Sequence, residues 1–311
     1  MKNIELNAIP WIKIKAWHDK HGIKINNLLD IPPNVVRLQW SEELEGLLEW
    51  HPHILGDSEY YAKLATVFPW YYQKSKHEFK FIIDYLKQIG DTTKHSLLEI
   101  GSGSGHFYQQ ILEADLNVKY KGIDLSQQAI TQCNNNFGKG IFYNLDAESI
   151  LSIGEKFDIV LSTQLVEHLE NPVHFFQSIQ KLLTANGIII TSIPSGESFM
   201  RYEGLPLNCP PHHQAIWTKQ AAISLAKLLN MNLDIFYTES IAPEHSSTFI
   251  RSLFRNSQST SQNLLKRFLR KSLLRILSPI LAFVFKDFNI PKAYGIAGHS
   301  SIFVLSNINL T

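Results

Sequence analysis

The stretch LLEIGSGSGHF, residues 97–107, has the residue types and spacing to hold a small ligand against the backbone. A hydrophobic run reaches Glu99, and Gly101, Gly103 and Gly105 follow at alternate positions. Glycine lets a backbone turn tightly and approach a ligand at van der Waals distance. A carboxylate just before such a loop is a poor neighbour for a pyrophosphate and a good neighbour for an ammonium group. The stretch therefore predicts a site for a cationic ligand.

Two phosphate-binding patterns that also follow a first strand do not fit this stretch. A P-loop requires GxxxxGK[ST], and the chain has no such lysine here. A dinucleotide fingerprint that starts at Gly101 requires a third glycine at position 106, where the chain has His106. Both comparisons point away from a phosphate ligand.

Two further acids follow the next two predicted strands. Asp124 lies about 20 residues after Gly103, where a carboxylate can accept both hydroxyl groups of a ribose. Asp146 follows the third strand, where it can meet an adenine amino group, although such an acid taken alone is more often a helix cap or a solvated turn residue. Ligands of open α/β sheets bind at the carboxyl ends of the strands. Together with Glu99, these acids predict an adenosine site without phosphate contacts.

Alternating strands and helices must position these residues. Strands are predicted at 96–100, 118–125, 140–145, 156–163, 187–194, 232–239 and 300–307, and helices at 74–89, 107–115, 126–137, 171–183 and 217–230. This alternation predicts an α/β fold, a parallel sheet with helices on both faces. A long insertion separates the last two strands.

Four regions are expected along the chain. Residues 1–73 form an aromatic-rich N-terminal cap, which we expect to be irregular but packed, and 74–239 form the core. Residues 240–297 form a helical insertion with basic and apolar parts, and 298–311 contain the last core strand.

Bulk properties exclude several classes. The chain has 311 residues and a formal net charge of +1, so no overall charge favours nucleic acid as a partner. Its two cysteines, Cys133 and Cys209, suit a reducing cytoplasm better than a disulfide framework. The start of the chain lacks the pattern of a signal peptide, and no run of about 18 apolar residues suggests a membrane span.

The segments LLEIGSGSG, GIDLS, NLDAE and FDIVLSTQLVEHLENP resemble those of the class I S-adenosylmethionine-dependent methyltransferases, and the likeness extends over residues 74–239. It implies a Rossmann-like seven-stranded sheet in the order 3-2-1-4-5-7-6, mostly parallel, with the last strand antiparallel. It also implies S-adenosyl-L-methionine as cofactor, with S-adenosyl-L-homocysteine as product.

The resemblance also implies roles for individual residues. The methionine part of the cofactor would lie against Glu99, Gly101, Ser102, Gly103 and Gly105. The ribose would bind Asp124, the adenine would contact Leu125, Asp146 and Ala147, and the sulfonium would lie near Gln164. Tyr72 precedes the first core helix and can close over the cofactor, or be a plain core aromatic.

Narrower likenesses point to two kinds of acceptor. VEHLENP, LLTANGIIITSIP and NCPPHHQAIW resemble a subgroup with quinone-ring O-methyltransferases and bacterial glycan-cluster and lipid methyltransferases. Quinone-ring members carry ExxEH, which can bind a divalent metal; here the positions are Gln164, Glu167 and His168. An amide at the first position weakens a site for a hard cation, so no metal is predicted. We expect Glu167 and His168 to fix the loop by hydrogen bonds.

His212 and His213 follow Pro210 and Pro211 in the region after the fifth core strand. Prolines stiffen this loop, and the acceptor pocket of the fold lies there. Methylation of oxygen or nitrogen often needs a base, and histidine titrates in the right range. One of the two, with a slight preference for His213, is therefore the predicted catalytic residue. The alternative is that both pack on Trp217 and hydrogen-bond the backbone.

Residues 264–286 combine a basic stretch with an apolar one. The apolar part is too short to span a bilayer. The segment can lie on an anionic membrane surface, which would suit a lipid-linked acceptor, or pack on the domain or against a second copy in a homodimer.

The predicted function is transfer of a methyl group from S-adenosyl-L-methionine to an oxygen or nitrogen of a small-molecule, glycan-type or lipid-linked acceptor. We expect a cytoplasmic enzyme of glycan biosynthesis, placed at the inner face of the membrane if 264–286 contacts it. The enzymatic alternative is quinone-ring O-methylation. A third reading is a non-catalytic cofactor-binding or scaffold subunit.

Overall fold

The computed structural model describes residues 8–25, 28–68, 76–198, 206–241 and 298–308. Tyr72 and the segment 264–286 lie outside these residues, so the predictions for them stay predictions. Among the described residues, no helix has both the length and the apolar character needed to cross a bilayer.

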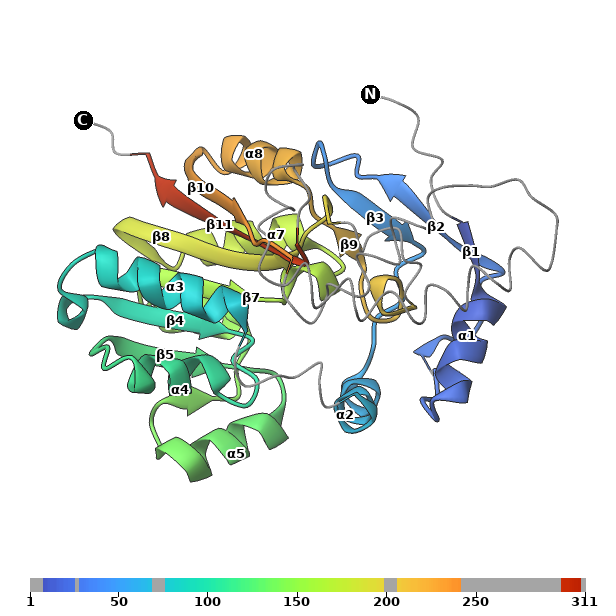
Figure 1. The fold of residues 1–311 in the computed structure, drawn as a ribbon, viewed down its shortest axis with the longest axis horizontal. Coiled ribbons are helices and arrows are strands. Elements are labelled where there is room, and N and C mark those ends of the chain that lie inside the picture. Colours follow the sequence, from blue (N-terminus) through green and yellow to red (C-terminus); the bar gives the residue numbers. More distant parts are fainter. Residues whose placement is uncertain (1–7, 26–27, 69–75, 199–205, 242–297, 309–311) are drawn as a thin grey trace, which may run out of the picture.

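A seven-stranded sheet forms the centre of the core (Figure 1). Its strands are β4 (Ser96–Ile100), β5 (Lys119–Ile123), β6 (Phe142–Tyr143), β7 (Phe157–Thr163), β8 (Leu183–Pro194), β10 (Met231–Thr238) and β11 (Ser300–Asn307). They are arranged as β10-β11-β8-β7-β4-β5-β6. Strand β11 pairs antiparallel with both β8 and β10, whereas the other pairs are parallel. The predicted order and the antiparallel last strand are confirmed.

Helices cover both faces of this sheet. They are α3 (His77–Gln88), α4 (His106–Glu113), α5 (Gln127–Phe137), α6 (Ala147–Ile153), α7 (Pro172–Gln180) and α8 (Lys219–Leu228). Apolar residues of α3 and α4 pack into one buried cluster with one face of the strands. Those of α6, α7 and α8 pack into another on the opposite face. Burial on both faces explains the apolar runs in the central strands β4, β7 and β8.

The N-terminal residues form regular structure, so the expectation that they are irregular is wrong. They contain β1 (Ala8–Pro10), α1 (Trp11–Lys20), β2 (Val35–Trp40), β3 (Leu48–His51) and α2 (Ser58–Val67). These strands form a second sheet, in the order β1-β2-β3-β9, whose last strand is β9 (Ala215–Ile216) from the segment after β8. Each of these strands is too short for an alternation of apolar and polar residues to predict it from the sequence.

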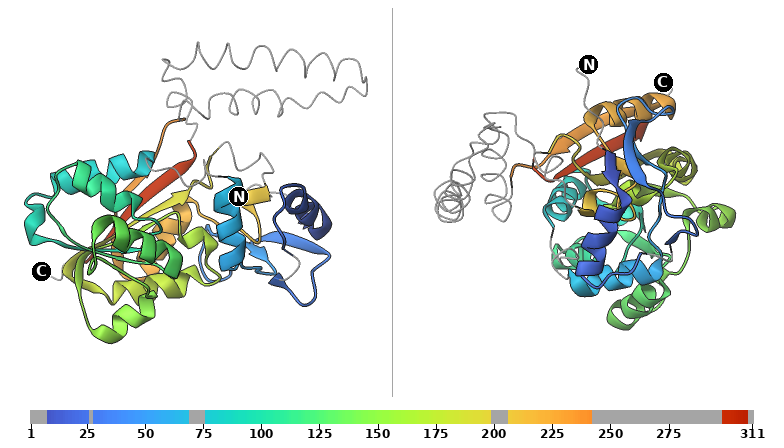
Figure 2. Two further views of the ribbon diagram at one scale, coloured as in Figure 1. Left: turned by 90° about the horizontal axis from the view of Figure 1, so that it is seen from below. Right: turned by 90° about the vertical axis from the view of Figure 1, so that its right-hand side faces the viewer.

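The N-terminal unit has its own apolar core, and the expectation of packing is confirmed. Trp11, Trp50, Tyr60 and Leu64 are among its buried members. Views from two directions show this unit beyond one end of the central sheet, beside the loops that follow the parallel strands (Figures 1 and 2). The unit therefore lies next to the edge where the sequence predicts a ligand. The boundary proposed at residue 73 stays a prediction.

Candidate active site

The glycine loop, residues 101–105, connects β4 to α4. Its three glycines have positive φ angles of 76°, 52° and 74°, a region that favours glycine. The amides of Gly101 and Ser102 donate to the carbonyl of Ile123 at 2.9 and 3.0 Å, which holds the loop against the end of β5. A Cβ atom at Gly105 would lie 2.9 Å from the ring of Phe137, whereas one at Gly103 would meet nothing within 4 Å. Gly105 is thus required by packing, and Gly103 faces space that a ligand can use.

Asp124 braces this loop from the end of β5. Its Oδ2 accepts a hydrogen bond from the amide of Gly103 at 2.8 Å, and its Oδ1 accepts one from the amide of Ser126 at 2.7 Å. The thiol of Cys133 donates to the carbonyl of Gly103 at 3.3 Å. The predicted ribose acceptor and the predicted glycine loop are therefore in direct contact.

Glu99 is buried beneath the loop, with 2% of its surface exposed. The hydroxyl of Tyr120 donates a hydrogen bond to its Oε2. Burial raises the pKa of Glu99 to about 8, because desolvation outweighs the opposing effect of the Tyr120 hydrogen bond. A carboxyl group in this state gains most from a neighbouring cation, which is the partner that the sequence predicts for it.

The predicted adenine contacts lie on the exposed side of the same edge. Leu125 is 76% exposed, so its apolar surface is accessible at this edge. Asp146 is the N-cap of α6, and its Oδ1 accepts from the amide of Ser149 at 2.7 Å. A carboxylate has about four acceptor sites, so Asp146 can still accept from an adenine amino group beside its cap hydrogen bond. Ala147 is half-buried at the first position of α6.

Gln164 follows β7 with a positive φ of 50°, a conformation uncommon outside glycine. Its amide N–H donates to the carbonyl of Ser192 at 2.9 Å. Its side-chain Nε2 is buried and has no hydrogen-bond partner among the residues that the structure describes. Backbone strain and an unpaired polar atom occur together at functional sites more than elsewhere, which fits the prediction that a ligand lies here.

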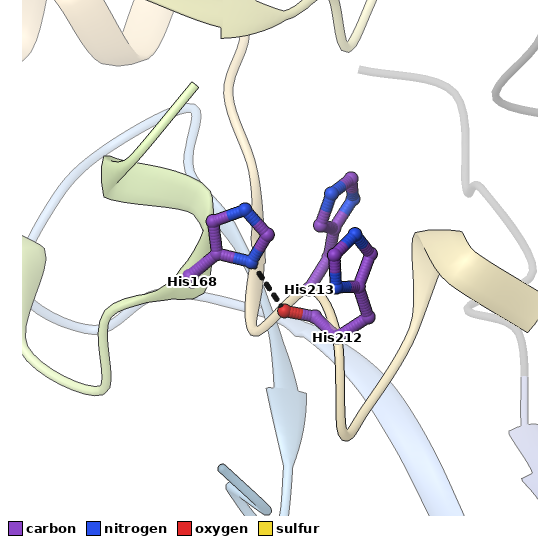
Figure 3. A group of neighbouring side chains, drawn as sticks. All are labelled: His168, His212 and His213. Carbon is purple, nitrogen blue, oxygen red and sulfur yellow. Dashed lines mark hydrogen bonds between the residues drawn. The ribbon is translucent and has the colours of Figure 1, made fainter. Parts of the chain in front are cut away.

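His212 and His213 meet His168, and the three are called the histidine cluster (Figure 3). The rings of His212 and His213 stack with their centroids 4.6 Å apart and their planes 19° apart. Both are fully or almost fully buried, and burial lowers their pKa values well below the usual 6.5. They are therefore neutral at pH 7. They pack on one another and on His168.

Glu167 and His168, at the last two positions of the ExxEH motif, differ in their contacts. His168 fixes the loop as expected, because its Nδ1 donates to the carbonyl of His212 at 2.6 Å. The expectation is wrong for the side chain of Glu167. This carboxylate is 1% exposed, and within the described part of the chain neither of its oxygens accepts a hydrogen bond. Burial raises its pKa to about 8.

The sequence did not predict the partners of Glu99 and His168. Tyr120 was not singled out, although Glu99 pairs with Gly122 and Tyr120 lies two residues earlier on the same face of β5. If the register of β4 against β5 were known, it would predict the contact of Tyr120 with Glu99. The contact of His168 with His212 joins positions 44 residues apart, and no local pattern in the chain predicts it.

The geometry can be compared with known proteins. The family model described as "Methyltransferase domain" matches residues 98–189. A "Ubiquinone biosynthesis O-methyltransferase" of Cereibacter sphaeroides is 32% identical over 100 residues, and the aligned part covers 31% of this chain and 40% of that relative. A "Non-reducing polyketide synthase mapC" of Penicillium roqueforti is 26% identical over 122 residues, which are 35% of this chain and 5% of the relative.

Two solved structures illustrate the structural comparison. A SAM-dependent methyltransferase from Archaeoglobus fulgidus aligns with a TM-score of 0.46 and 15% identity over 74% of this chain and 94% of its own. A putative sarcosine dimethylglycine methyltransferase from Galdieria sulphuraria aligns with a TM-score of 0.48 and 14% identity, over 74% of this chain and 84% of its own.

The family match begins in β4 and ends in β8, so it spans the glycine loop, Asp124, Asp146 and Gln164. The strand order around these residues is the order that the class I resemblance implies. Residues 98–189 therefore match a methyltransferase domain, and the sheet that contains them has the strand order of the class I S-adenosylmethionine-dependent methyltransferase fold.

Proposed function

We propose that this chain transfers a methyl group from S-adenosyl-L-methionine to an oxygen or nitrogen atom of a small-molecule or of a glycan- or lipid-linked acceptor. The observation that carries the proposal is the contact of the glycine loop with Asp124, above the buried Glu99. The cofactor has an ammonium group at one end and ribose hydroxyls nearer the other. The site offers an acid for each.

The adenine end fits the same arrangement. Leu125 offers an exposed apolar surface for the ring, and Asp146 offers an acceptor for its amino group. The sulfonium would then lie near Gln164, whose side-chain Nε2 has no hydrogen-bond partner among the described residues. Methyl transfer is a displacement at an activated carbon, so holding the two reactants in line is the main task of the enzyme.

The acceptor side is proposed to lie between the loop after β7 and the N-terminal unit. Tyr61 of α2 contacts His168, with its hydroxyl 3.4 Å from Nδ1, so the two regions meet. His213 or His212 is predicted to act as the base. For this role, the acceptor atom has to come within reach of a buried, neutral imidazole ring. The proposal also includes a role in glycan biosynthesis, a cytoplasmic location and a membrane contact through residues 264–286.

Quinone-ring O-methylation is the second candidate. The relatives of 30–32% identity that carry the name "Ubiquinone biosynthesis O-methyltransferase" favour it, although the match covers only about 40% of their length. A panel of catechol-type and sugar-type acceptors with labelled methyl donor separates the two candidates, because only the correct class accepts label.

The test of the proposal is calorimetric titration of the purified protein with S-adenosyl-L-methionine and, as controls, with NAD and ATP. We expect 1:1 binding of the methyl donor alone. Binding of NAD or ATP in its place, or no binding by the folded protein, contradicts the proposal. Binding without methyl transfer to any acceptor supports a non-catalytic subunit instead.

A further inference from the structure

The histidine cluster has the geometry of a metal site. His168 comes from the short 3-10 helix Val166–His168 after β7, whereas His212 and His213 come from the loop before β9. Their ring centroids lie 4.6, 5.0 and 4.6 Å apart. One ring nitrogen from each residue can be chosen so that all three lie within 4.8 Å of one another. Figure 3 shows the rings gathered around a common region.

The hydrogen bond of His168 fixes which of its nitrogens can bind an ion. A carbonyl oxygen only accepts, so the 2.6 Å contact with the carbonyl of His212 places the ring proton on Nδ1. The Nε2 atom of the neutral ring therefore carries a lone pair. A histidine that binds a metal through one nitrogen usually donates its other N–H to a carbonyl or carboxylate, and His168 already does so.

A buried carboxyl group without a hydrogen bond from the described residues lies beside this lone pair. Oε1 of Glu167 is 3.7 Å from Nε2 of His168. Within the described residues, neither oxygen of this buried carboxylate accepts a hydrogen bond. A buried acid without hydrogen bonds is costly, and a cation at the cluster would balance its charge. This observation is independent of the ring geometry and points to the same ligand.

The backbone holds the two halves of the cluster together. The amide of Gln214 donates to the carbonyl of Glu167 at 2.7 Å, and the amide of Trp50 donates to the carbonyl of Gln214 at 2.8 Å. The side chain of Gln214 bonds both the amide and the carbonyl of Ile54, at 3.1 and 2.8 Å. The positions of the rings are therefore set by the N-terminal unit as well as by the core.

We propose that His168, His212 and His213 bind one divalent transition-metal ion of the zinc type, with Glu167 balancing its charge. Imidazole nitrogen favours ions such as Zn²⁺, Co²⁺ or Fe²⁺ over Mg²⁺ and Ca²⁺, which prefer oxygen. Two nitrogens on one tetrahedral Zn²⁺ lie about 3.4 Å apart, so the rings need to shift by roughly 1 Å or less. These three imidazole ligands differ from the ExxEH ligands of the quinone-ring methyltransferases. The amide at the first position of that motif is the reason that the sequence predicts no metal.

Three protein ligands leave a fourth position on the ion, as in catalytic zinc sites. If the proposed methyl transfer holds, an acceptor oxygen can occupy that position and lose its proton more readily. This role, unlike the metal site itself, rests on the proposed function. It is an alternative to a base at His212 or His213, because bound rings have no lone pair left for a proton.

The test uses untagged protein stripped with a chelator and then titrated with Co²⁺. We expect the intense visible absorption of four-coordinate Co²⁺, saturation at one ion per chain and displacement by Zn²⁺. His168→Ala should weaken binding by about 100-fold or more, and Glu167→Gln by about 10-fold or more. The chain has 13 histidines, so His174→Ala, an exposed histidine of α7, is the matched control and should bind like the wild type.

Absence of these bands in folded wild-type protein at excess Co²⁺ overturns the proposal, as does a His168→Ala protein that binds within about threefold of the wild type. Melting curves show whether each variant folds; if one does not, the wild-type titration decides alone. Titration of the same stripped protein with S-adenosyl-L-homocysteine separates the two ideas. Cofactor binding without metal binding refutes the metal site only, and the reverse result refutes the proposed function only.

Discussion

Cofactor binding should depend strongly on pH through Glu99. Its pKa of about 8 means that most of the free protein carries a neutral carboxyl group below pH 7. An ammonium group binds the ionised form, so the apparent dissociation constant rises as the ionised fraction falls. At pH 5.5 that fraction is about 0.3%, and at pH 7.5 it is about 24%. Affinity for S-adenosyl-L-homocysteine should therefore rise about 80-fold over this range, and about 25-fold if the pKa is one unit lower.

The assay is calorimetric titration with S-adenosyl-L-homocysteine at half-unit steps from pH 5.5 to 7.5. Over this range the ammonium group of the ligand stays largely protonated, so the carboxyl group is the main titrating partner. Repeating the titration in buffers of different ionisation enthalpy should show close to one proton released per ligand near pH 6. The product is used in place of the donor because it keeps the ammonium group and cannot react.

Two variants sharpen the interpretation. Glu99→Gln should weaken binding at pH 7.5 and abolish most of the pH dependence, whereas Glu42→Gln, an exposed acid of the N-terminal unit, should change neither. Tyr120→Phe removes the hydrogen bond that stabilises the ionised form, so it should move the profile upward by about one pH unit. A flat wild-type profile, or a Glu99→Gln protein with the same slope as the wild type, refutes the reasoning.

Four further predictions follow from the same contacts. Asp124→Asn should weaken cofactor binding by about 10-fold to 100-fold in calorimetry, because charged hydrogen bonds are lost, whereas the exposed Asp115→Asn should not. Gly105→Ala should lower the free energy of unfolding in urea by about 2–4 kcal/mol through backbone strain and overlap with the Phe137 ring; an unchanged value contradicts the packing argument. The folded-state pKa of Glu99 lies above its ordinary value, so ionisation destabilises the fold; this cost is absent below pH 4.5 and complete above about pH 8. Glu99→Gln should therefore be more stable than the wild type by a few kcal/mol at pH 8.5 and close to it at pH 4.5, and equal stability at both pH values contradicts the burial argument. For the segment 264–286, wild type should sediment with anionic liposomes and a deletion of the segment should not; equal sedimentation excludes it as the membrane contact.

The alternating strands and helices of the core could be predicted from the sequence. Buried strands such as 156–163 contain apolar runs, here Ile159 to Leu161, and caps such as Asn171 followed by Pro172 mark where helices begin. The glycine loop and its acids could be predicted because they follow strand ends, and parallel strands bring those ends to one edge. The order of the strands came from the family resemblance, since periodicity does not determine which strands are neighbours.

The remaining parts depend on contacts between distant segments. The sheet of the N-terminal unit is completed by Ala215 and Ile216, two residues that are too few to show a strand pattern. The histidine cluster needs the loop after β7 and the loop before β9 to be placed against each other. Asp146 shows a further limit, because its sequence position suits both a helix cap and an adenine contact; the structure shows the cap, and the adenine contact stays a prediction.

The most direct test of the central claim is a structure of the protein with S-adenosyl-L-homocysteine bound. The account predicts the ammonium group of the ligand within hydrogen-bonding reach of Glu99 and the ribose hydroxyls at the carboxylate of Asp124, with the adenine against Leu125. A ligand bound at another edge of the sheet, or one whose ammonium group and ribose do not meet these two acids, would contradict it.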